Sequence, residues 1–315
     1  MSNKNKVIEV LVGFSLVALT ASSMSVSAEE KSTTRNTDKD YQLELETAPK
    51  GVATFTPPKE ADIPDTPFGE AVRYGKSLFM DTQQLRGKYV NNELNCGNCH
   101  LDRGRMANSA PLWGAFPMYP AYRSKNDHVN TIDERIRGCF TYSMNGTPPP
   151  FASKELTAMV AYSYWMSTGA PTGQALPGRG YPKLDKAKLE PDVGRGKMVY
   201  NDNCAICHGA NGGGTKANGK YAFPPLWGKD SFNWGAGMHR VNTAAGFIKA
   251  NMPLGKPNSL SDQEAWDVAA FMNSHERPQD PRFKGNIDET ANTFHKHQCF
   301  YDKKVDDKLI GTGTK

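Results

Sequence analysis

Two copies of the pattern Cys-x-x-Cys-His carry the clearest chemistry in this 315-residue chain, and they begin 108 residues apart. In such a pattern the two thiols can form thioether bonds to a porphyrin, while the adjacent imidazole is held under the ring as an iron ligand. A zinc site would need a second cysteine pair, and neither copy has one beside it. The chain is therefore predicted to carry two covalently bound c-type hemes. Their expected attachment residues are Cys96, Cys99, Cys204 and Cys207, and their expected proximal iron ligands are His100 and His208.

The first residues have the features of a secretory signal peptide, predicted to span residues 1–28. A basic start, an apolar run and the small residues Val26-Ser27-Ala28 place the cleavage before Glu29. No later stretch approaches the ~20 apolar residues that a membrane-spanning helix needs. We therefore expect a periplasmic protein without a membrane span, in a compartment that also permits disulfides.

The charge balance says little about partners. Loss of the signal segment removes two lysines and one glutamate, which lowers the formal net charge from +5 to +4. The propionate groups of two hemes would roughly cancel this charge. The sequence therefore gives no basis for a nucleic-acid partner.

Each heme signature lies in the same sequence context, which indicates a duplicated unit. A short helical segment precedes the signature, at 68–79 in the first half and at 193–200 in the second. The sequence Pro-Leu-Trp-Gly follows the signature, at 111–114 and at 225–228. An aromatic-rich helix closes each half, at 153–167 and at 261–274. This order resembles the cytochrome c fold, twice over. The predicted fold class is all-α, with two cytochrome c-like domains, each with one covalently attached heme, joined by a linker.

The domain boundaries follow from composition. Residues 171–191 are rich in proline and glycine, as expected of a linker. The predicted parts are a signal peptide at 1–28, an N-terminal extension at 29–66, a first domain at 67–170, the linker, a second domain at 192–280 and a C-terminal tail at 281–315. The tail is expected to wrap over the surface.

In the cytochrome c fold a proline carbonyl after the signature often accepts the ring N–H of the proximal histidine. Pro111 and Pro225 would suit this role, although both could be plain turn prolines. The five histidines outside the signatures are expected to be surface or packing residues, and they are His128, His239, His275, His295 and His297.

Function depends on the ligand opposite each proximal histidine, because a thioether raises the heme potential and a thiolate lowers it. In the second half the predicted ligand is Met252, which lies 44 residues after His208, in a loop before the last helix. Met238 and His239 are alternatives that come earlier in the same loop.

In the first half two candidates imply two different proteins. Met144 holds the position that corresponds to Met252, whereas Cys139 stands five residues earlier and outside both heme signatures. Methionine would make the chain an electron carrier, and a cysteine thiolate would bring a reactive sulfur to the heme. A Cys139–Cys299 disulfide is a third reading, because two cysteines remain after the hemes are counted.

Cys139 is expected near the end of a helix that starts at the capping box Thr131-x-x-Glu134. Arg135 precedes the cysteine by four residues, so that the guanidinium and the sulfur share one side of the helix. Arg137 has acidic neighbours at helical spacing and is expected to form a helix salt bridge. Arg135 has none, so it is the arginine expected to bind an anion.

The segment from Arg135 to Cys139, followed by Ser143-Met144-Asn145-Gly146, resembles the active-site segment of the diheme thiosulfate dehydrogenases, also known as tetrathionate reductases. The stretches 119–123 and 251–255 are similar to that family as well, and the resemblance covers most of the mature chain. It implies that Cys139 is an axial ligand of the first heme and part of the active site. It also implies a plain His208/Met252 second heme, because Asn251 replaces the lysine that some members carry there.

The activity implied by this resemblance is the interconversion of two thiosulfate ions and one tetrathionate with two electrons. Arginine forks suit sulfonate oxygens, which makes Arg135 and Arg123 the candidate substrate-binding residues, with Lys125 as a weaker one. Electrons would pass through the second heme to or from a small redox protein or a quinol-linked cytochrome. The alternatives are a purely electron-transferring diheme cytochrome c and a heme subunit of a sulfur-oxidising complex.

Overall fold

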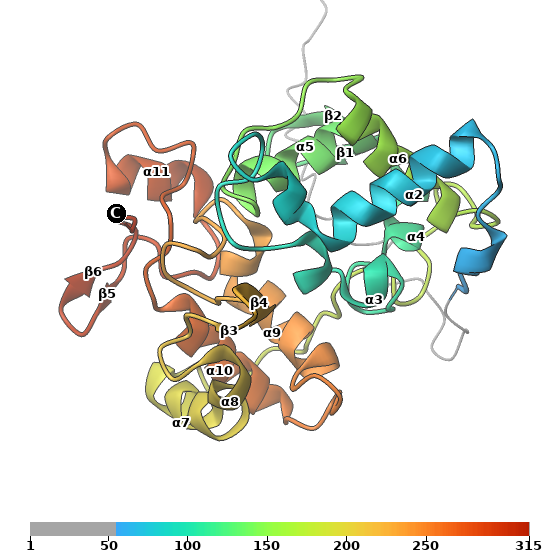
Figure 1. Ribbon diagram of the computed structural model, residues 1–315. Coiled ribbons are helices and arrows are strands. Elements are labelled where there is room, and N and C mark those ends of the chain that lie inside the picture. Colours follow the sequence, from blue (N-terminus) through green and yellow to red (C-terminus); the bar gives the residue numbers. More distant parts are fainter. Residues whose placement is uncertain (1–54, 315) are drawn as a thin grey trace, which may run out of the picture. The chain divides into compact units, whose positions relative to one another are not determined.

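The computed structural model describes residues 55–314, so the predicted signal peptide and most of the predicted extension lie outside the described residues. All described residues belong to one compact unit. Helices dominate it, and its strands form three two-stranded antiparallel hairpins (Figure 1). Among these residues there is no helix with the length and apolar character needed to cross a membrane.

The first half begins with a helix that its sequence caps at the start. Thr66 accepts a hydrogen bond from the Gly69 amide at 3.3 Å, as expected at a helix N-terminus that also carries a proline. The elements of this half are η1 (Glu60–Asp62), α2 (Pro67–Met80), η2 (Thr82–Leu85), η3 (Cys96–Asn98), α3 (Leu101–Gly104), α4 (Leu112–Ala115), η4 (Phe116–Met118), β1 (Ala121–Arg123), β2 (His128–Asn130), α5 (Ile132–Tyr142) and α6 (Lys154–Met166).

The second half repeats this plan with a different hairpin position. Its last helix starts at the predicted capping box, in which the Ser261 side chain accepts from the Glu264 amide at 3.2 Å. The elements are α7 (Val193–Asn203), α8 (Ala205–His208), β3 (Thr215–Ala217), β4 (Lys220–Phe223), η5 (Gly237–His239), α9 (Val241–Asn251) and α10 (Asp262–Asn273).

The first and last helices of each half cross at a glycine. A methyl group on Gly75 of α2 would overlap the backbone carbonyl of Ala158 on α6. In the second half, a methyl group on Gly196 of α7 would overlap the carbonyl of Asp267 on α10. Only glycine permits this close backbone approach, which explains why Gly-Lys occurs at the same place before both heme signatures.

Side-chain amides join the two halves. Asn92 donates to the Ser231 carbonyl at 3.1 Å. Asn251, at the end of α9, donates to the Asn108 carbonyl at 3.0 Å and is buried. Because buried amides without partners are costly, these bonds favour one arrangement of the two halves.

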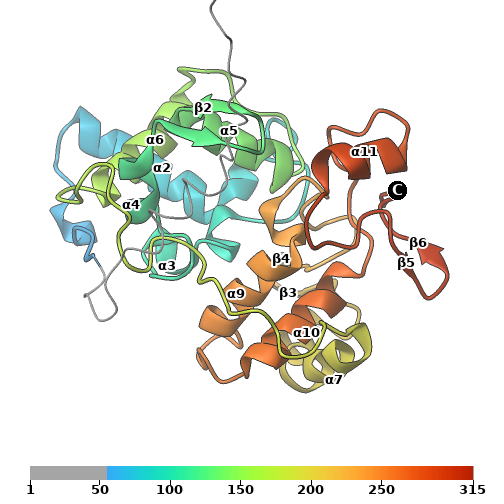
Figure 2. The same ribbon diagram turned by 180° about the vertical axis from the view of Figure 1, so that it is seen from behind.

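The predicted linker runs as an extended segment from α6 to α7, past α9 and α10 (yellow-green in Figure 2). It contacts both halves along its length. The Gly178 carbonyl accepts from the Asn108 amide at 2.7 Å, and the Asp185 carbonyl accepts from the Trp266 indole at 3.1 Å.

The tail contains α11 (Ile287–Phe294) and the hairpin of β5 (Lys304–Val305) with β6 (Lys308–Leu309). Its apolar side chains build a small core of their own with Trp234, in which Tyr301 and Ile310 are buried. The tail is therefore more than a surface wrap, because it packs around a tryptophan of the second half.

Candidate active site

Each proximal histidine is held by a carbonyl one residue before the proline expected from the sequence. His100 Nδ1 donates to the Ala110 carbonyl at 2.6 Å, and His208 Nδ1 donates to the Pro224 carbonyl at 2.9 Å. The expectation for Pro111 and Pro225 is thus wrong by one residue. A proline restricts the backbone of the residue before it, so the carbonyl that is held in place belongs to that preceding residue.

These hydrogen bonds leave the Nε2 lone pair of each ring for an iron ion. Burial lowers the pKa of His100 to about 4, and it also lowers the pKa of His208. Both imidazoles are therefore neutral at neutral pH, which is the state that a metal ligand requires.

The first pair of attachment thiols is partly buried, as is Cys139, which lies near enough to influence their pKa. Burial raises the pKa of Cys96 to about 11 and that of Cys99 to about 12, and the nearby sulfur of Cys139 adds to both shifts. The Thr82 hydroxyl donates to Cys96 Sγ at 3.4 Å. The thiols thus stay uncharged until they react.

On α5, Arg135 Nη1 donates to Cys139 Sγ at 2.9 Å. The helix begins at the predicted capping box of Thr131 and Glu134, and the four-residue spacing places the two side chains in contact. The sulfur of Cys139 raises the pKa of the Arg135 guanidinium above its usual value. A permanent positive charge therefore lies directly beside this cysteine.

Arg137 does not form the salt bridge expected of it. Its guanidinium donates to the Pro149 carbonyl and lies 4.1 Å from the ring centre of Phe151. Glu134, one of the expected partners, accepts from the Thr131 amide at 2.7 Å and pairs with His128 at 3.2 Å. The carboxylate is already engaged in capping the helix, so it does not reach back to Arg137.

Of the two other readings of the first half, the geometry contradicts the Cys139–Cys299 disulfide. Met144 is only 3% exposed and packs in an apolar cluster with Leu78 and Phe140. Cys139 and Cys299 are both free, so they form no disulfide with each other.

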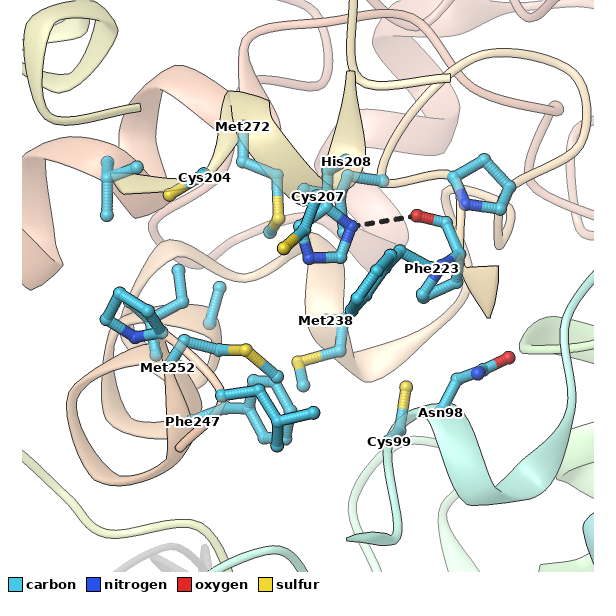
Figure 3. A pocket seen from close by; sticks show the side chains of 18 of the residues that line it. Asn98, Cys99, Cys204, Cys207, His208, Phe223, Met238, Phe247, Met252 and Met272 are labelled. Carbon is cyan, nitrogen blue, oxygen red and sulfur yellow. Dashed lines mark hydrogen bonds between the residues drawn. The ribbon is translucent and has the colours of Figure 1, made fainter. Parts of the chain in front are cut away.

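In the second half, a cavity of about 260 Å³ fits a porphyrin through its chemistry. It is lined by apolar side chains together with both attachment thiols, His208 and the thioethers of Met238, Met252 and Met272. Figure 3 shows His208 with its hydrogen bond on one side of this space and the sulfur atoms of Met238 and Met252 opposite. The residues present are those that could attach and ligate a c-type heme.

The same cavity has part of its wall in the first half. Asn98 and Cys99, from the first attachment segment, line it together with residues of α9. His239, an alternative ligand, is not among its lining residues. Both ring nitrogens of His239 bond elsewhere, to the Ala236 carbonyl and to His297.

Comparison with known proteins shows which protein families this chain matches. Residues 84–172 match the family described as the SoxA/TsdA cytochrome c domain, and residues 191–272 match that of the cbb3-type cytochrome c oxidase subunit III. A thiosulfate dehydrogenase of Stutzerimonas stutzeri (strain A1501) is 58% identical over 268 residues, which are 84% of this chain and 87% of that protein. The chain belongs to the thiosulfate dehydrogenase family. A second relative in this family, from Thiomonas intermedia (strain K12), is 53% identical over 82% of this chain and 83% of its own length.

A solved structure of this family has the same fold. It is the thiosulfate dehydrogenase TsdBA from Marichromatium purpuratum in its as-isolated form, with a TM-score of 0.81 and 48% identity over 84% of this chain. This chain spans 59% of that chain's length. The predictions of two cytochrome c-like domains, two c-type hemes and an oxidoreductase are thereby confirmed.

The two other basic residues expected to bind substrate lie before α5, Arg123 at the end of the family-like stretch and Lys125 two residues after it. Arg123 ends β1, opposite His128 of β2. Lys125 lies in the turn of this hairpin, where its ammonium is 3.5 Å from the ring centre of Tyr142 and donates to the Gly235 carbonyl. Burial lowers the pKa of Lys125 to about 7, so this side chain changes its charge near neutral pH.

Two tyrosines near Arg135 were not singled out from the sequence. Tyr119 and Tyr181 both influence the pKa of Arg135, and the Tyr181 hydroxyl donates to the Cys99 carbonyl at 3.4 Å. Tyr119 begins a stretch that is similar to the family, which is a weak signal. Tyr181 belongs to the predicted linker, where no sequence pattern marks it as part of a site.

Proposed function

We propose that this chain couples two thiosulfate ions to one tetrathionate with release of two electrons, or runs the reverse reaction, in the periplasm. The observation that carries the proposal is the contact between Arg135 and Cys139 beside the first attachment thiols. The relatives named as thiosulfate dehydrogenases match this chain over most of their length. An electron carrier alone would have no use for a cysteine and a guanidinium in this position.

Arg135 can offset the repulsion between the two negatively charged substrates. Two thiosulfate dianions must approach each other, and a guanidinium fork can bind sulfonate oxygens while it offsets their repulsion. Arg123 and Lys125, which precede α5, are the further cations proposed to bind substrate. Water is restricted there because Arg135 is only partly exposed, and charge pairing is stronger in such a setting.

Cys139 is the proposed nucleophile. Its thiolate and the terminal sulfur of one thiosulfate form a disulfide bond, which releases two electrons and leaves the side chain as Cys–S–S–SO₃⁻. The terminal sulfur of a second thiosulfate then attacks the sulfur next to the sulfonate, so that tetrathionate forms and the Cys139 thiolate leaves. Covalent catalysis of this kind divides one encounter of two dianions into two steps.

The hemes, when bound, supply two one-electron acceptors, which matches the two electrons released. His100 and Cys139 are the residues proposed to hold the iron in the first half, and the Cys139 sulfur would react when it is not bound to that iron. His208 and Met252 are the proposed ligands in the second half, where a soft thioether favours electron uptake. A small redox protein or a quinol-linked cytochrome is the proposed electron partner.

The test uses purified protein with both hemes attached. Thiosulfate plus a one-electron dye should give one tetrathionate for every two thiosulfate ions consumed, as measured by ion chromatography. Tetrathionate plus a reduced dye tests the reverse direction. Dye reduction must occur without any added protein, because a subunit of a larger complex would be inactive alone.

A lack of turnover in both directions, in protein that contains two hemes by pyridine hemochrome assay, would refute the proposed function. Electron exchange with dyes but no product would support the purely electron-transferring alternative.

A further inference from the structure

Four side chains that commonly bind metals lie together outside both heme sites. They are His239, His295, His297 and Cys299, and one ligand atom of each lies within 4.8 Å of all the others. His239 belongs to η5 of the second half, whereas the other three follow α11 in the tail. His295, His297 and Cys299 lie close together in the sequence, whereas His239 precedes His297 by 58 residues and is brought to them by the fold.

Each of two rings has its second nitrogen already bonded, as in metal sites. His239 Nδ1 donates to the Ala236 carbonyl, which leaves Nε2 as a lone pair. That Nε2 atom lies 2.6 Å from Nε2 of His297. The tautomer of His239 is therefore the one that a metal ion needs at this point.

The second ring is oriented by a carboxylate. His295 Nε2 donates to Asp280 at 3.0 Å, and both side chains are fully buried. Its Nδ1 atom is thus free of a proton and lies 3.8 Å from Cys299 Sγ. Arg282 pairs with Asp280 at 2.6 Å, so the carboxylate is itself held in place.

The spacing of the four atoms suits a small tetrahedral ion. With Zn–N distances of about 2.0–2.1 Å and a Zn–S distance of about 2.3 Å, the ligand atoms would be about 3.3–3.6 Å apart. In the structure, the distances between the four ligand atoms begin at 2.6 Å and stay within 4.8 Å. Small side-chain rotations would therefore bring the atoms to the tetrahedral spacing.

The charges around the cluster favour neutral imidazoles. Burial lowers the pKa of His239 well below its usual value and that of His297 to about 3, and Arg240 contributes to both shifts. Burial also raises the pKa of Cys299, so an ion must displace its proton to solvent. Because cations surround the site, the thiolate charge is essential for holding a divalent ion.

We propose that His239 Nε2, His295 Nδ1, His297 Nε2 and Cys299 Sγ form a closed, structural zinc site that fastens the tail to the second half. Four protein ligands that leave no position for substrate are typical of structural zinc, and His239 and His295 are buried. The site is separate from sulfur turnover and would be present whether or not the proposed function is right.

The first experiment is metal analysis of the two-heme protein produced with zinc in the medium and then dialysed. Iron from the hemes serves as an internal standard, so we expect about one zinc for every two irons. The zinc X-ray absorption edge, which heme iron does not mask, should report three nitrogen neighbours at about 2.0–2.1 Å and one sulfur at about 2.3 Å.

Variants test the ligands separately. Cys299→Ser and His297→Gln should each lower the zinc content at least about tenfold, which corresponds to 1.4 kcal/mol or more of binding free energy. The control His128→Gln changes an exposed histidine outside the cluster and should keep its zinc. The heme content and Soret spectrum of each variant show whether it has folded.

A zinc content below about one tenth per chain in the wild-type protein would overturn the proposal. So would zinc that is retained by both ligand variants, or copper found in its place. Hydrogen exchange adds an independent readout: removal of zinc by a chelator should increase exchange in 287–301, and unchanged exchange would contradict a fastening role.

Discussion

The two halves of the molecule share the helix crossing and the support of the proximal histidine, and they differ in the side chains of the helix before the ligand loop. In both, a glycine lets the first and last helices cross, and a backbone carbonyl orients the proximal imidazole. With the offset of 108 between the heme signatures, Cys139 of α5 corresponds to Phe247 of α9, and Arg135 corresponds to Thr243. These shared features would hold the heme in each half, and on the proposed function the helix before the ligand loop decides whether sulfur chemistry can occur.

The largest effect is expected from Cys139→Ala. Both hemes should stay attached because the attachment thiols are unchanged, and turnover should fall by about 1,000-fold or more, as when other enzymes lose a nucleophile. Steady-state dye reduction and a hemochrome assay measure the two properties. Met144→Leu is the matched control and should keep its activity. Retained activity in the alanine variant would show that the Cys139 thiol is not what makes the first half catalytic.

Arg135→Gln should lower kcat/KM for thiosulfate by about 10- to 100-fold, because a hydrogen bond to a charged group contributes about 1.5–3 kcal/mol. Arg135→Lys keeps the charge without the planar fork and should recover part of the loss. An equal loss in both variants would show that geometry, rather than charge, is what Arg135 provides.

The shared helix crossing predicts equal stability losses in the two halves. Gly75→Ala and Gly196→Ala should each lower the free energy of unfolding by about 1–3 kcal/mol, because the new methyl group meets a backbone carbonyl. Gly180→Ala, where a methyl group would meet nothing within 4 Å, is the control. Urea denaturation followed by heme absorbance measures the effect, and a loss in only one half would argue against equivalent helix crossings.

Met252→Leu should remove the methionine-to-iron charge-transfer band of the second heme in the far-red spectrum and slow turnover with a protein acceptor several-fold. Met238→Leu should leave the band unchanged. The cavity contains both sulfurs, so this pair of variants decides which of them is the ligand. Loss of the band in the Met238 variant alone would reverse the assignment.

The smallest effect concerns pH. Lys125 has a pKa lowered to about 7 by burial, and the charged groups that face it are Arg282, Arg135, Asp280 and Cys139. Its positive charge is present below that pH and lost above it, so the KM for thiosulfate should rise about fivefold between pH 6 and pH 8, the effect of roughly 1 kcal/mol. Lys125→Arg should flatten this dependence. The same slope in the arginine variant would assign the effect to another group.

Much of the fold could be predicted from sequence because it rests on local patterns. The capping boxes at Thr131 and Ser261 start helices where expected, and the four-residue spacing places Arg135 against Cys139. These features depend on residues only a few positions apart, so their geometry follows from the period of one helix.

The parts that were missed depend on contacts between distant segments. Tyr181 approaches Arg135 because the linker folds back along the first half, and no local pattern encodes this path. His239 meets His295 only after the tail packs around Trp234. The carbonyls that accept from the proximal rings belong to the residues just before the predicted prolines. The sequence identifies a proline, but it does not show how the peptide before that proline is oriented.

Asn98 and Cys99 form part of the wall of the cavity in the second half, and this placement bears on the order in which the two electrons leave the substrate. A two-electron reaction with one-electron acceptors must dispose of its first electron before the second one leaves. Cys99, which would attach the first heme, lines the cavity that would hold the second heme, so electrons would pass between the two hemes through a short stretch of protein. On the proposed function, the external redox partner would need access only to the second half, and the sulfur chemistry would stay shielded from it.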